Sequence, residues 1–390
     1  MRRVQPMRTF SAGLALALGL AGLLPQAAAA QSKRYIGFGD SITYGVGDEK
    51  NPDGLGGYTP RLQSLLNTRG FPATVVNAGL PGEDTAGALT RINSVLQRGG
   101  DVLLLMEGTN DINAKVSEET TLANLNQLAV RAENRGMQAV HITIIPRLAG
   151  AGTDGNNRVT GELNGKLRDL AWFKQRRLAD PFEVFWNETP DFTQLYGGGI
   201  DKLHPNAAGY DLMAKVIADA LTNVDSVPPV TGLVDPTDDE QNVPSSTPIR
   251  VDLYDFGAGI DLANTKLLVN GAPVTATPTG TPQQASFNYT PPTPWVGVIA
   301  FGIQTQDLAN PPHKVNRTLS TFVVAGTAFL RGDIDRNGRV DGVDLLAFAP
   351  RFGARTPDPR YKTFADLNGD GVVDGTDLAI LASNFGKTSF

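Results

Sequence analysis

The sequence has 390 residues, of which 19% are charged and none is cysteine, and its formal net charge is −6 at pH 7. Without cysteine the chain can form neither a disulfide framework nor a thiolate zinc site. An acidic chain repels phosphate backbones, so we expect no nucleic-acid partner, and the length predicts two or three domains.

The first thirty residues have the composition of a secretory signal peptide. Arginines at positions 2, 3 and 8 form a basic head, residues 12–24 are apolar, and residues 28–30 are alanines that suit a cleavage site. Because the apolar run is short for a bilayer span, we expect cleavage near Ala30, a secreted protein and no stable membrane anchor. Removal of three arginines and no acid would give the remaining chain a net charge of −9.

Residues 31–224 alternate between apolar runs and helical patterns. The expected strands cover residues 35–38, 73–77, 102–106, 139–145 and a short run near Val184, and the expected helices cover residues 60–70, 84–97, 117–136, 158–175 and 207–221. This alternation predicts an α/β domain in which helices cover both faces of a parallel sheet. In such domains ligands bind beyond the carboxyl ends of the strands.

A candidate nucleophile follows the first predicted strand, in the stretch Gly39-Asp40-Ser41-Ile42-Thr43-Tyr44-Gly45. A serine on a strand-to-helix turn has an exposed hydroxyl, although a single turn serine is more often a helix cap. Serine also needs a base to take its proton. His204 in the loop before the last helix is the candidate base, and Asp201, three residues earlier, could hold its imidazole in the right tautomer.

Two further turns follow predicted strands, at Asn77-Ala78-Gly79 and at Gly108-Thr109-Asn110-Asp111. They could place a backbone N–H and a side-chain amide around a developing oxyanion. Asp40 and Asp111 are interpreted as turn or capping residues rather than reacting groups.

These four blocks, in this order, resemble the SGNH (GDSL) hydrolase superfamily over residues 33–223. The resemblance implies a flavodoxin-like three-layer αβα sandwich with five parallel strands, in which Ser41 is the nucleophile, His204 the base and Asp201 its orienting acid. It also implies an oxyanion hole formed by the backbone N–H groups of Ser41 and Gly79 and the amide of Asn110, and no cofactor for catalysis. An α/β-hydrolase would need Gly-x-Ser-x-Gly around the nucleophile and an acid far from the histidine, so that alternative is not favoured.

Residues 225–326 show no helical period. Short β-rich runs at 249–253, 267–269, 296–303 and 321–324 alternate with turn residues, which predicts an antiparallel β-sandwich. The patterns at 255–261 and 269–271 resemble bacterial Ig-like modules, for which we predict a spacer role. Two histidines lie outside the predicted site: His141, in an apolar run, is interpreted as a core residue, and His313 as an exposed one.

Residues 327–390 contain a segment that is repeated at an offset of 33 residues. Each copy places oxygen-bearing side chains at positions 1, 3, 5, 9 and 12 of a loop, with glycine at position 6, which suits a bound calcium ion. The expected ligands of two Ca²⁺ ions are Asp333, Asp335, Asn337, Asp341 and Asp344, then Asp366, Asn368, Asp370, Asp374 and Asp377, with the carbonyls of Arg339 and Val372 at position 7. Position 12 holds aspartate instead of the usual glutamate.

A calcium loop followed by one helix, given twice, resembles the type I dockerin module, which pairs with a cohesin on another protein. In that family the residues at loop positions 10 and 11 help to choose the partner. Here they are Gly342 and Val343, then Gly375 and Thr376; only Thr376 carries a hydroxyl, so they depart from the hydroxyl-containing pair often found there. The resemblance therefore implies a possible cohesin-type partner of unknown identity.

The sequence thus predicts four parts: a signal peptide (1–30), an SGNH esterase domain (31–224), an Ig-like β-sandwich (225–326) and a dockerin-like calcium-binding domain (327–390). The predicted function is a secreted serine esterase that works through an acyl-enzyme. The dockerin-like tail favours acylated carbohydrate as the substrate, such as O-acetyl esters on cell-wall polysaccharide. The alternatives are a lipid, lysophospholipid or thioester hydrolase of the same family, and a scaffold-docking or adhesion protein without activity.

Overall fold

The structure is a computed structural model that describes residues 31–49, 56–148, 154–189, 191–197, 201–325, 330–335, 338–355, 360–362 and 364–388. The expected signal peptide and the expected calcium ligand Asn337 lie outside the described residues. No helix in these ranges has both the length and the apolar character needed to cross a membrane.

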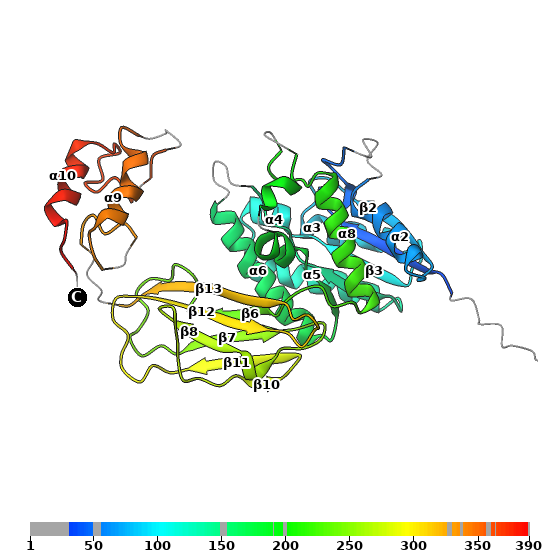
Figure 1. Cartoon of the computed structure of the whole chain (residues 1–390). Helices are drawn as coiled ribbons and strands as arrows, with labels where there is room; N and C mark the ends of the chain where they lie inside the picture. Colours follow the sequence, from blue (N-terminus) through cyan, green and yellow to red (C-terminus); the bar gives the residue numbers. More distant parts are fainter. Residues whose placement is uncertain are drawn as a thin grey trace, which may run out of the picture. The chain divides into compact units, whose positions relative to one another are not determined.

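The first part of the chain, with helices α2 to α8 in Figure 1, is built on a parallel sheet. Its strand order is β2-β1-β3-β4-β5. The strands are β1 (Lys33–Gly39), β2 (Ala73–Gly79), β3 (Val102–Met106), β4 (Gln138–Ile142) and β5 (Arg177–Ala179). All neighbouring strands in this sheet run parallel. The predicted α/β fold with five parallel strands in flavodoxin-like order is confirmed.

Helices cover both faces of this sheet, and two apolar cores result. The longer helices are α2 (Tyr58–Thr68), α3 (Thr85–Leu96), α5 (Glu118–Glu133), α6 (Asp154–Phe173) and α8 (Ala207–Thr222). On β3, Leu104 and Met106 pack in one core with α2 and α8, while Leu103 and Leu105 pack in the other with α3 and α5. Successive side chains of a strand point to opposite faces, so an unbroken apolar run is what a strand covered on both sides requires.

The edge strand β2 is paired on its open side by side chains of α2. The backbone N–H groups of Ala73 and Val75 donate to Asn67 Oδ1 at 2.9 Å and to Gln63 Oε1 at 2.8 Å. Asn67 Nδ2 in turn donates to the carbonyl of Ala73 at 3.1 Å. Amide side chains thus occupy hydrogen-bonding positions that a neighbouring strand would otherwise fill.

The prediction of a strand near Val184 is wrong. The fifth strand is β5, which ends at Ala179, and a short helix α7 (Pro181–Glu183) follows it and leads into a π-helical turn, η1 (Val184–Glu188). The Asp180 side chain accepts from Glu183 N at 3.1 Å, and Pro181 stands at the start of α7, so a cap and a proline begin a helix there. The apolar residues read as a strand belong to this helix.

Residues 230–323 form two antiparallel four-stranded sheets, with the orders β10-β11-β7-β6 and β13-β12-β8-β9. Their strands are β6 (Val230–Asp235), β7 (Ile249–Tyr254), β8 (Lys266–Val269), β9 (Ala272–Pro273), β10 (Thr279–Thr281), β11 (Gln284–Tyr289), β12 (Val298–Gln306) and β13 (Lys314–Val323). Val251 and Phe287 from one sheet share a core with Phe301 and Phe322 from the other. The structure is therefore a β-sandwich, as predicted, and its Ig-like character stays a prediction.

The repeated tail folds as two similar loop–helix units. Helices α9 (Gly342–Phe348) and α10 (Gly375–Asn384) begin at Asp341 and Asp374, whose side chains accept from backbone N–H groups of the first turn. In both units the aspartate three residues later accepts from the backbone N–H of the capping residue, which completes a capping box. A small core shared by both units contains Val340, Phe348, Val373 and Leu381.

His141 lies in the core of the parallel sheet, as the sequence suggested. It is fully buried on β4, with its Nε2 atom 3.5 Å from the Arg176 guanidinium. Among the described residues its Nδ1 atom has no hydrogen-bond partner. Burial, reinforced by the positive charge of Arg176, lowers the pKa of His141 to about 3.

We therefore expect His141 to make the fold sensitive to acid. Below pH 6.5 the unfolded chain binds a proton that the folded chain excludes, so His141 should cost about 2 kcal/mol of stability by pH 5. Urea unfolding at pH 7 and pH 5 should show a smaller loss in a His141→Gln variant than in the parent. Groups with raised pKa values act in the opposite direction, but they are common to both proteins. Parallel losses in parent and variant would contradict the prediction.

Candidate active site

Ser41 is the first residue of the short helix α1 (Ser41–Tyr44), and Asp40 alone separates it from the end of β1. Asp40, not Ser41, caps this helix, since its Oδ1 atom accepts from Ile42 N at 2.8 Å. The hydroxyl of Ser41 is therefore free for another contact. Its backbone N–H lies in the first turn of a helix, where no carbonyl partner exists within the helix.

The structure brings Ser41, His204 and Asp201 into one hydrogen-bonded chain, although Ser41 and His204 are 163 positions apart. Ser41 Oγ lies 2.8 Å from His204 Nε2, and His204 Nδ1 lies 2.7 Å from Asp201 Oδ2. Ser41 is 7% exposed, and the His204 side chain is 17% exposed. This geometry is that of a serine nucleophile, a base and an acid that orients the base.

Asp201 is held as an ionised acceptor. Its Oδ1 atom accepts from the backbone N–H groups of Leu203 and His204, each at 3.0 Å. Burial alone would raise the pKa of the Asp201 carboxyl, but these N–H donors and the His204 imidazole outweigh burial and lower it. A carboxylate that stays charged can keep the His204 Nδ1 atom protonated and its Nε2 atom directed at Ser41.

The loop that carries His204 is fixed at both ends. Leu148 N donates to the carbonyl of Lys202 at 2.8 Å, which ties the loop to the segment after β4. Asn206 caps α8 by accepting from Gly209 N at 3.0 Å. The imidazole is thereby positioned by the main chain as well as by its own two contacts.

Gly79, predicted as an oxyanion donor, has its backbone N–H already paired. That N–H donates to Asn77 Oδ1 at 2.9 Å, while Asn77 Nδ2 donates to the carbonyls of Thr43 and Tyr44. A Cβ atom on Gly79 would lie 2.2 Å from Tyr44 N. Gly79 thus allows β2 to approach α1 closely, and in this structure it does not offer a free donor.

The next turn contains a donor that the sequence reasoning missed. Gly82 has a φ of +79°, and its backbone N–H takes part in no hydrogen bond found among the described residues. Asn110 reaches the same turn, because its Nδ2 atom donates to the carbonyl of Glu83 at 2.7 Å. The signal available in the sequence was the second glycine of Asn77-Ala78-Gly79-Leu80-Pro81-Gly82.

Asp111 has a structural role, as the sequence suggested. It is buried and accepts from the backbone N–H of Thr85 at 2.9 Å and from the Thr85 hydroxyl at 2.5 Å. These contacts join the helix α4 (Thr109–Ala114), which carries Asn110, to the start of α3. Asp111 therefore fixes Asn110 relative to the Gly82 turn.

A group of buried acids that includes Asp40, the residue before Ser41, was not predicted. Asp40 is fully buried, and Glu83 and Glu107 are 7% and 1% exposed. Arg91 pairs with Glu83, with Nε at 2.8 Å from Oε1. Burial raises the pKa of Asp40 to about 6.

Glu107 is the most perturbed member of this acidic group. Burial raises its pKa well above the usual value, and the charges of Asp40 and Glu83 raise it further. Neither of its carboxyl oxygens meets an N–H or O–H donor within the described ranges. We infer that Glu107 keeps its proton at neutral pH, which lets it donate to a neighbouring carboxylate instead of repelling it.

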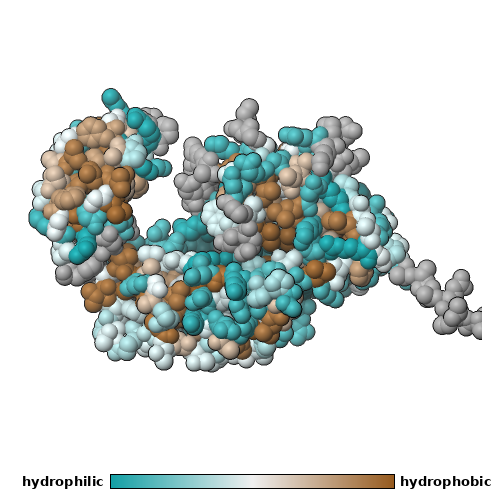
Figure 2. Space-filling model, in the orientation of Figure 1, coloured by the Kyte–Doolittle hydropathy of each residue, from teal (hydrophilic) through white to brown (hydrophobic). Residues whose placement is uncertain are grey.

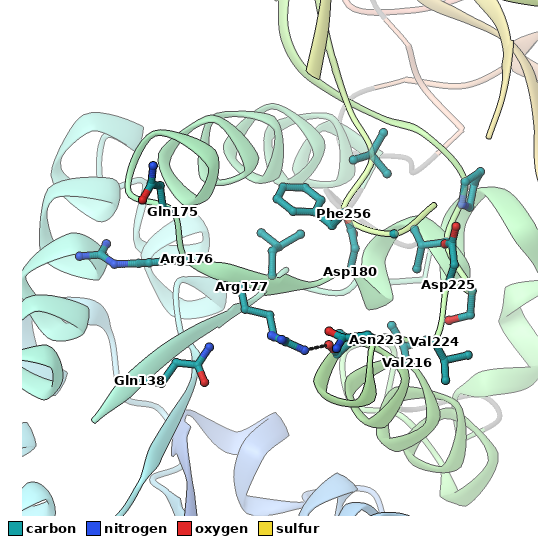
Figure 3. Close-up of a pocket in the computed structure, with 17 residues that line it drawn as sticks. Gln138, Gln175, Arg176, Arg177, Asp180, Val216, Asn223, Val224, Asp225 and Phe256 are labelled. Carbon is teal, nitrogen blue, oxygen red and sulfur yellow. Dashed lines mark hydrogen bonds between the residues drawn. The ribbon is translucent and has the colours of Figure 1, made fainter. Parts of the chain in front are cut away.

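A separate cavity of about 350 Å³ lies where strands β4 and β5 begin, at the opposite end of the strands from Ser41 (Figure 3). Gln138 and Arg177, which begin β4 and β5, line it, whereas Ser41 and Asn110 follow the ends of β1 and β3. The Arg177 guanidinium donates there to the carbonyl of Ala220 near the end of α8. This cavity is therefore distinct from the Ser41 site.

Comparison with family models identifies two parts of the chain. Residues 38–212 match the GDSL-like Lipase/Acylhydrolase family, and residues 331–385 match the Dockerin type I domain. The first match contains Ser41, Asn110, Asp201 and His204, and the second contains both predicted calcium loops.

Two curated proteins are similar to parts of this chain. A "Multidomain esterase" of Ruminococcus flavefaciens is 28% identical over 252 residues, which are 52% of this chain and 30% of that protein. "Esterase TesA" of Pseudomonas aeruginosa is 31% identical over 123 residues, which are 31% of this chain and 58% of that protein. The chain thus spans less than two thirds of the length of either relative.

Solved structures also match about half of the chain. Axe2, an acetylxylan esterase from Geobacillus stearothermophilus, is 20% identical with a TM-score of 0.42, covering 50% of this chain and 95% of that one. A lipase/acylhydrolase from Enterococcus faecalis is 22% identical with a TM-score of 0.42, covering 48% of this chain and 95% of that one.

The inferred proton on Glu107 predicts the behaviour of a Glu107→Gln variant. At pH 4 the Glu107 carboxyl holds its proton in both the folded and the unfolded parent. Its titration therefore contributes little to the difference in stability between parent and variant at that pH. As the pH rises to 7, unfolding of the parent releases that proton, so the variant should gain stability relative to the parent. Urea unfolding at the two pH values measures this gain. A Glu240→Gln variant, changed at an exposed position of the β-sandwich, is the control. A variant that loses stability relative to the parent between pH 4 and 7 would contradict the inference.

Proposed function

The chain contains a GDSL-like lipase/acylhydrolase domain and a dockerin type I domain, and from this premise we propose that it is a serine esterase that hydrolyses carboxylic esters. The observation that carries the proposal is the hydrogen-bonded chain from Ser41 through His204 to Asp201. The names of the two curated relatives, both esterases, support it.

The proposed reaction begins when Ser41 Oγ attacks the ester carbonyl carbon and His204 Nε2 takes the hydroxyl proton. Asp201 stabilises the imidazolium that forms, through the 2.7 Å contact with Nδ1. The proton then passes to the departing alcohol, and the acyl group stays on Ser41 as an ester. Water, deprotonated by His204, attacks this acyl-enzyme and releases the acid.

We assign the oxyanion hole to the backbone N–H groups of Ser41 and Gly82 and the amide of Asn110. The paired N–H of Gly79 argues against the assignment made from the sequence. Asn110 Nδ2 carries two hydrogens, so one can bond the Glu83 carbonyl while the other is directed at the substrate oxygen. Donors fixed before the reaction stabilise developing charge without reorganisation.

For the substrate we propose acylated carbohydrate, in particular O-acetyl esters on cell-wall polysaccharide. The support is the dockerin domain, since a dockerin would attach the enzyme to other proteins that act on such polymers. A lipid, lysophospholipid or thioester hydrolase is the alternative within the family. The rival without activity is a scaffold-docking or adhesion protein, against which the intact Ser41 hydrogen-bond chain speaks.

We propose further that the protein is secreted after cleavage near Ala30 and is divided into domains at about residues 224 and 326.

Figure 2 shows apolar residues on the surface of the C-terminal module. On α9 the side chains of Val343, Leu345 and Leu346 are 54%, 40% and 74% exposed. An exposed apolar helix face suits a protein partner, and a cohesin-type protein is the partner that a dockerin implies.

The C-terminal loops are proposed to bind two Ca²⁺ ions. In the first loop, carboxylate oxygens of Asp333, Asp335 and Asp344 lie within 4.8 Å of one another, and these oxygen donors fit a hard cation. In both loops the aspartate at position 12, Asp344 or Asp377, is fully buried. It accepts backbone N–H bonds from the start of its loop as well as from the helix cap. Calcium would therefore join the start of each loop to its helix.

A panel of esters tests the catalytic proposal. Purified protein should release acetate from acetylated xylan and hydrolyse short-chain esters faster than long-chain ones. A Ser41→Ala variant should lose activity by a factor on the order of 10⁶, because only substrate binding and the oxyanion donors remain.

Ser64→Ala, which changes an exposed serine on α2, is the matched control and should keep full activity. Ser41→Ala activity equal to that of the parent would overturn the enzyme proposal. A preference for long-chain or thioester substrates would keep the esterase and move it to the alternative substrate class.

Calcium should stabilise the C-terminal module in the full chain. Ca²⁺ at a hundredfold excess over its Kd adds about 2.7 kcal/mol to a folded state that binds it. Calorimetry should therefore show one transition at higher temperature in calcium than in chelator, and an Asp344→Asn, Asp377→Asn double variant should lose that shift. An Asp239→Asn variant, at an exposed position of the β-sandwich, should keep it. A melting profile unchanged by chelator would remove the calcium assignment.

A further inference from the structure

The loops at one end of the β-sandwich contain a second group of metal-ligating side chains, apart from both the Ser41 site and the calcium loops. Ligand atoms of Asp225, Asp307 and His313 lie within 4.8 Å of one another. Asp225 belongs to the linker between α8 and β6 and borders the cavity in Figure 3. Asp307 and His313 come from the connection between β12 and β13. The prediction that His313 is simply exposed is wrong, since its side chain is two-thirds buried against Asp307.

The main chain holds these groups in place. Asp307 is 1% exposed, and its Oδ1 atom accepts from His313 N at 2.8 Å and Ala309 N at 3.1 Å. Its Oδ2 atom lies 2.5 Å from His313 Nδ1. Asp225 Oδ2 accepts from Ala258 N at 2.7 Å. Since these donors are backbone or imidazole groups, no lysine or arginine in the described hydrogen bonds neutralises the two carboxylates.

A fourth residue, Asp255 at the end of β7, supplies an unpaired oxygen. Asp255 is 2% exposed, and its Oδ1 atom accepts from Gly257 N at 2.7 Å. Its Oδ2 atom is buried and has no hydrogen-bond partner in the described part of the chain. The Gly257 turn that binds Asp255 is also the turn against which Asp225 packs, so the two carboxyl groups approach the same loop.

The glycine beside Asp255 shows how closely the linker is packed on this loop. A Cβ atom built on Gly257 would lie 2.3 Å from Asp225 Cγ and 2.4 Å from Asp225 Oδ1. The carboxylate of Asp225 can therefore reach the Asp255 loop only because residue 257 has no side chain. The approach brings a third acid toward two that are already buried, which is unfavourable without a compensating positive charge.

We propose that Asp225, Asp307 and His313, with the buried carboxyl of Asp255 on the adjoining loop, form a site for one divalent transition-metal ion of the Zn²⁺ or Mn²⁺ class. A divalent cation would neutralise the converging carboxylates and give the buried Asp255 oxygen a partner. Carboxylate oxygens alone would suit Mg²⁺ or Ca²⁺ equally well, but an imidazole nitrogen among them favours Zn²⁺ or Mn²⁺. The bound ion would join the linker after α8 to two loops of the β-sandwich.

The test uses the full chain in excess calcium, so that the C-terminal loops are saturated, and Zn²⁺ as the probe. Equilibrium dialysis followed by elemental analysis gives the zinc bound per chain. Asp255→Asn and Asp307→Asn variants should each bind one Zn²⁺ fewer than the parent. Asp239→Asn, which changes an exposed aspartate of the same β-sandwich, should bind as much as the parent.

Two further measurements keep the test decisive. Circular dichroism and ester hydrolysis show whether each variant is folded, and a His313→Ala variant should also bind one ion fewer if Asp307→Asn fails to fold. Zinc binding that is equal in the parent and any folded variant of the three residues would overturn the proposal. One ion taken up as Ca²⁺ but not as Zn²⁺ or Mn²⁺ would overturn the assigned class of metal.

Discussion

The 2.8 Å contact between Ser41 Oγ and His204 Nε2 is the interaction on which the catalytic domain depends. It joins residues 163 positions apart, and only the parallel sheet makes this possible. The carboxyl ends of parallel strands all lie on the same side of the sheet. The turns after β1, β2 and β3 and the loop before α8 therefore meet there. The sheet thus positions the candidate site residues, which lie in short segments beyond the carboxyl ends of its strands.

The sequence was sufficient for the parallel sheet, because the strands follow from apolar runs. The short blocks next to those runs contain Ser41, His204 and Asp201, which the structure brings within hydrogen-bonding distance. The sequence was not sufficient for Gly79. Which backbone N–H stays free depends on where the Asn77 side chain turns, and that contact forms only when β2 and α1 pack together. Glu107 stands directly after an apolar run, yet its buried environment exists only in the folded domain. Val184 was misread because its apolar neighbours suit a strand as well as a buried helix.

Asp40 and Ser41, which are adjacent in sequence, have different hydrogen-bond partners. Asp40 caps α1, a task that serines often perform, and so leaves the Ser41 hydroxyl for His204. The same position buries a carboxyl near Glu83 and Glu107; Arg91 pairs with Glu83, and burial raises the pKa of Glu107. The unfavourable burial of charge therefore involves Asp40, Glu83 and Glu107 and not the Ser41 hydroxyl itself. We expect substitutions of these acids to change the stability of the domain.

The amide side chains that cover β2 bear on how the protein behaves when many copies stand close together. Gln63 and Asn67 occupy backbone groups of Ala73 and Val75 on that margin of the sheet, and the other margin is a strand of only three residues. Neither margin gives a second molecule a long template for β-pairing. The parallel sheet is thereby less able to pair with a second copy of itself when copies of the protein are concentrated.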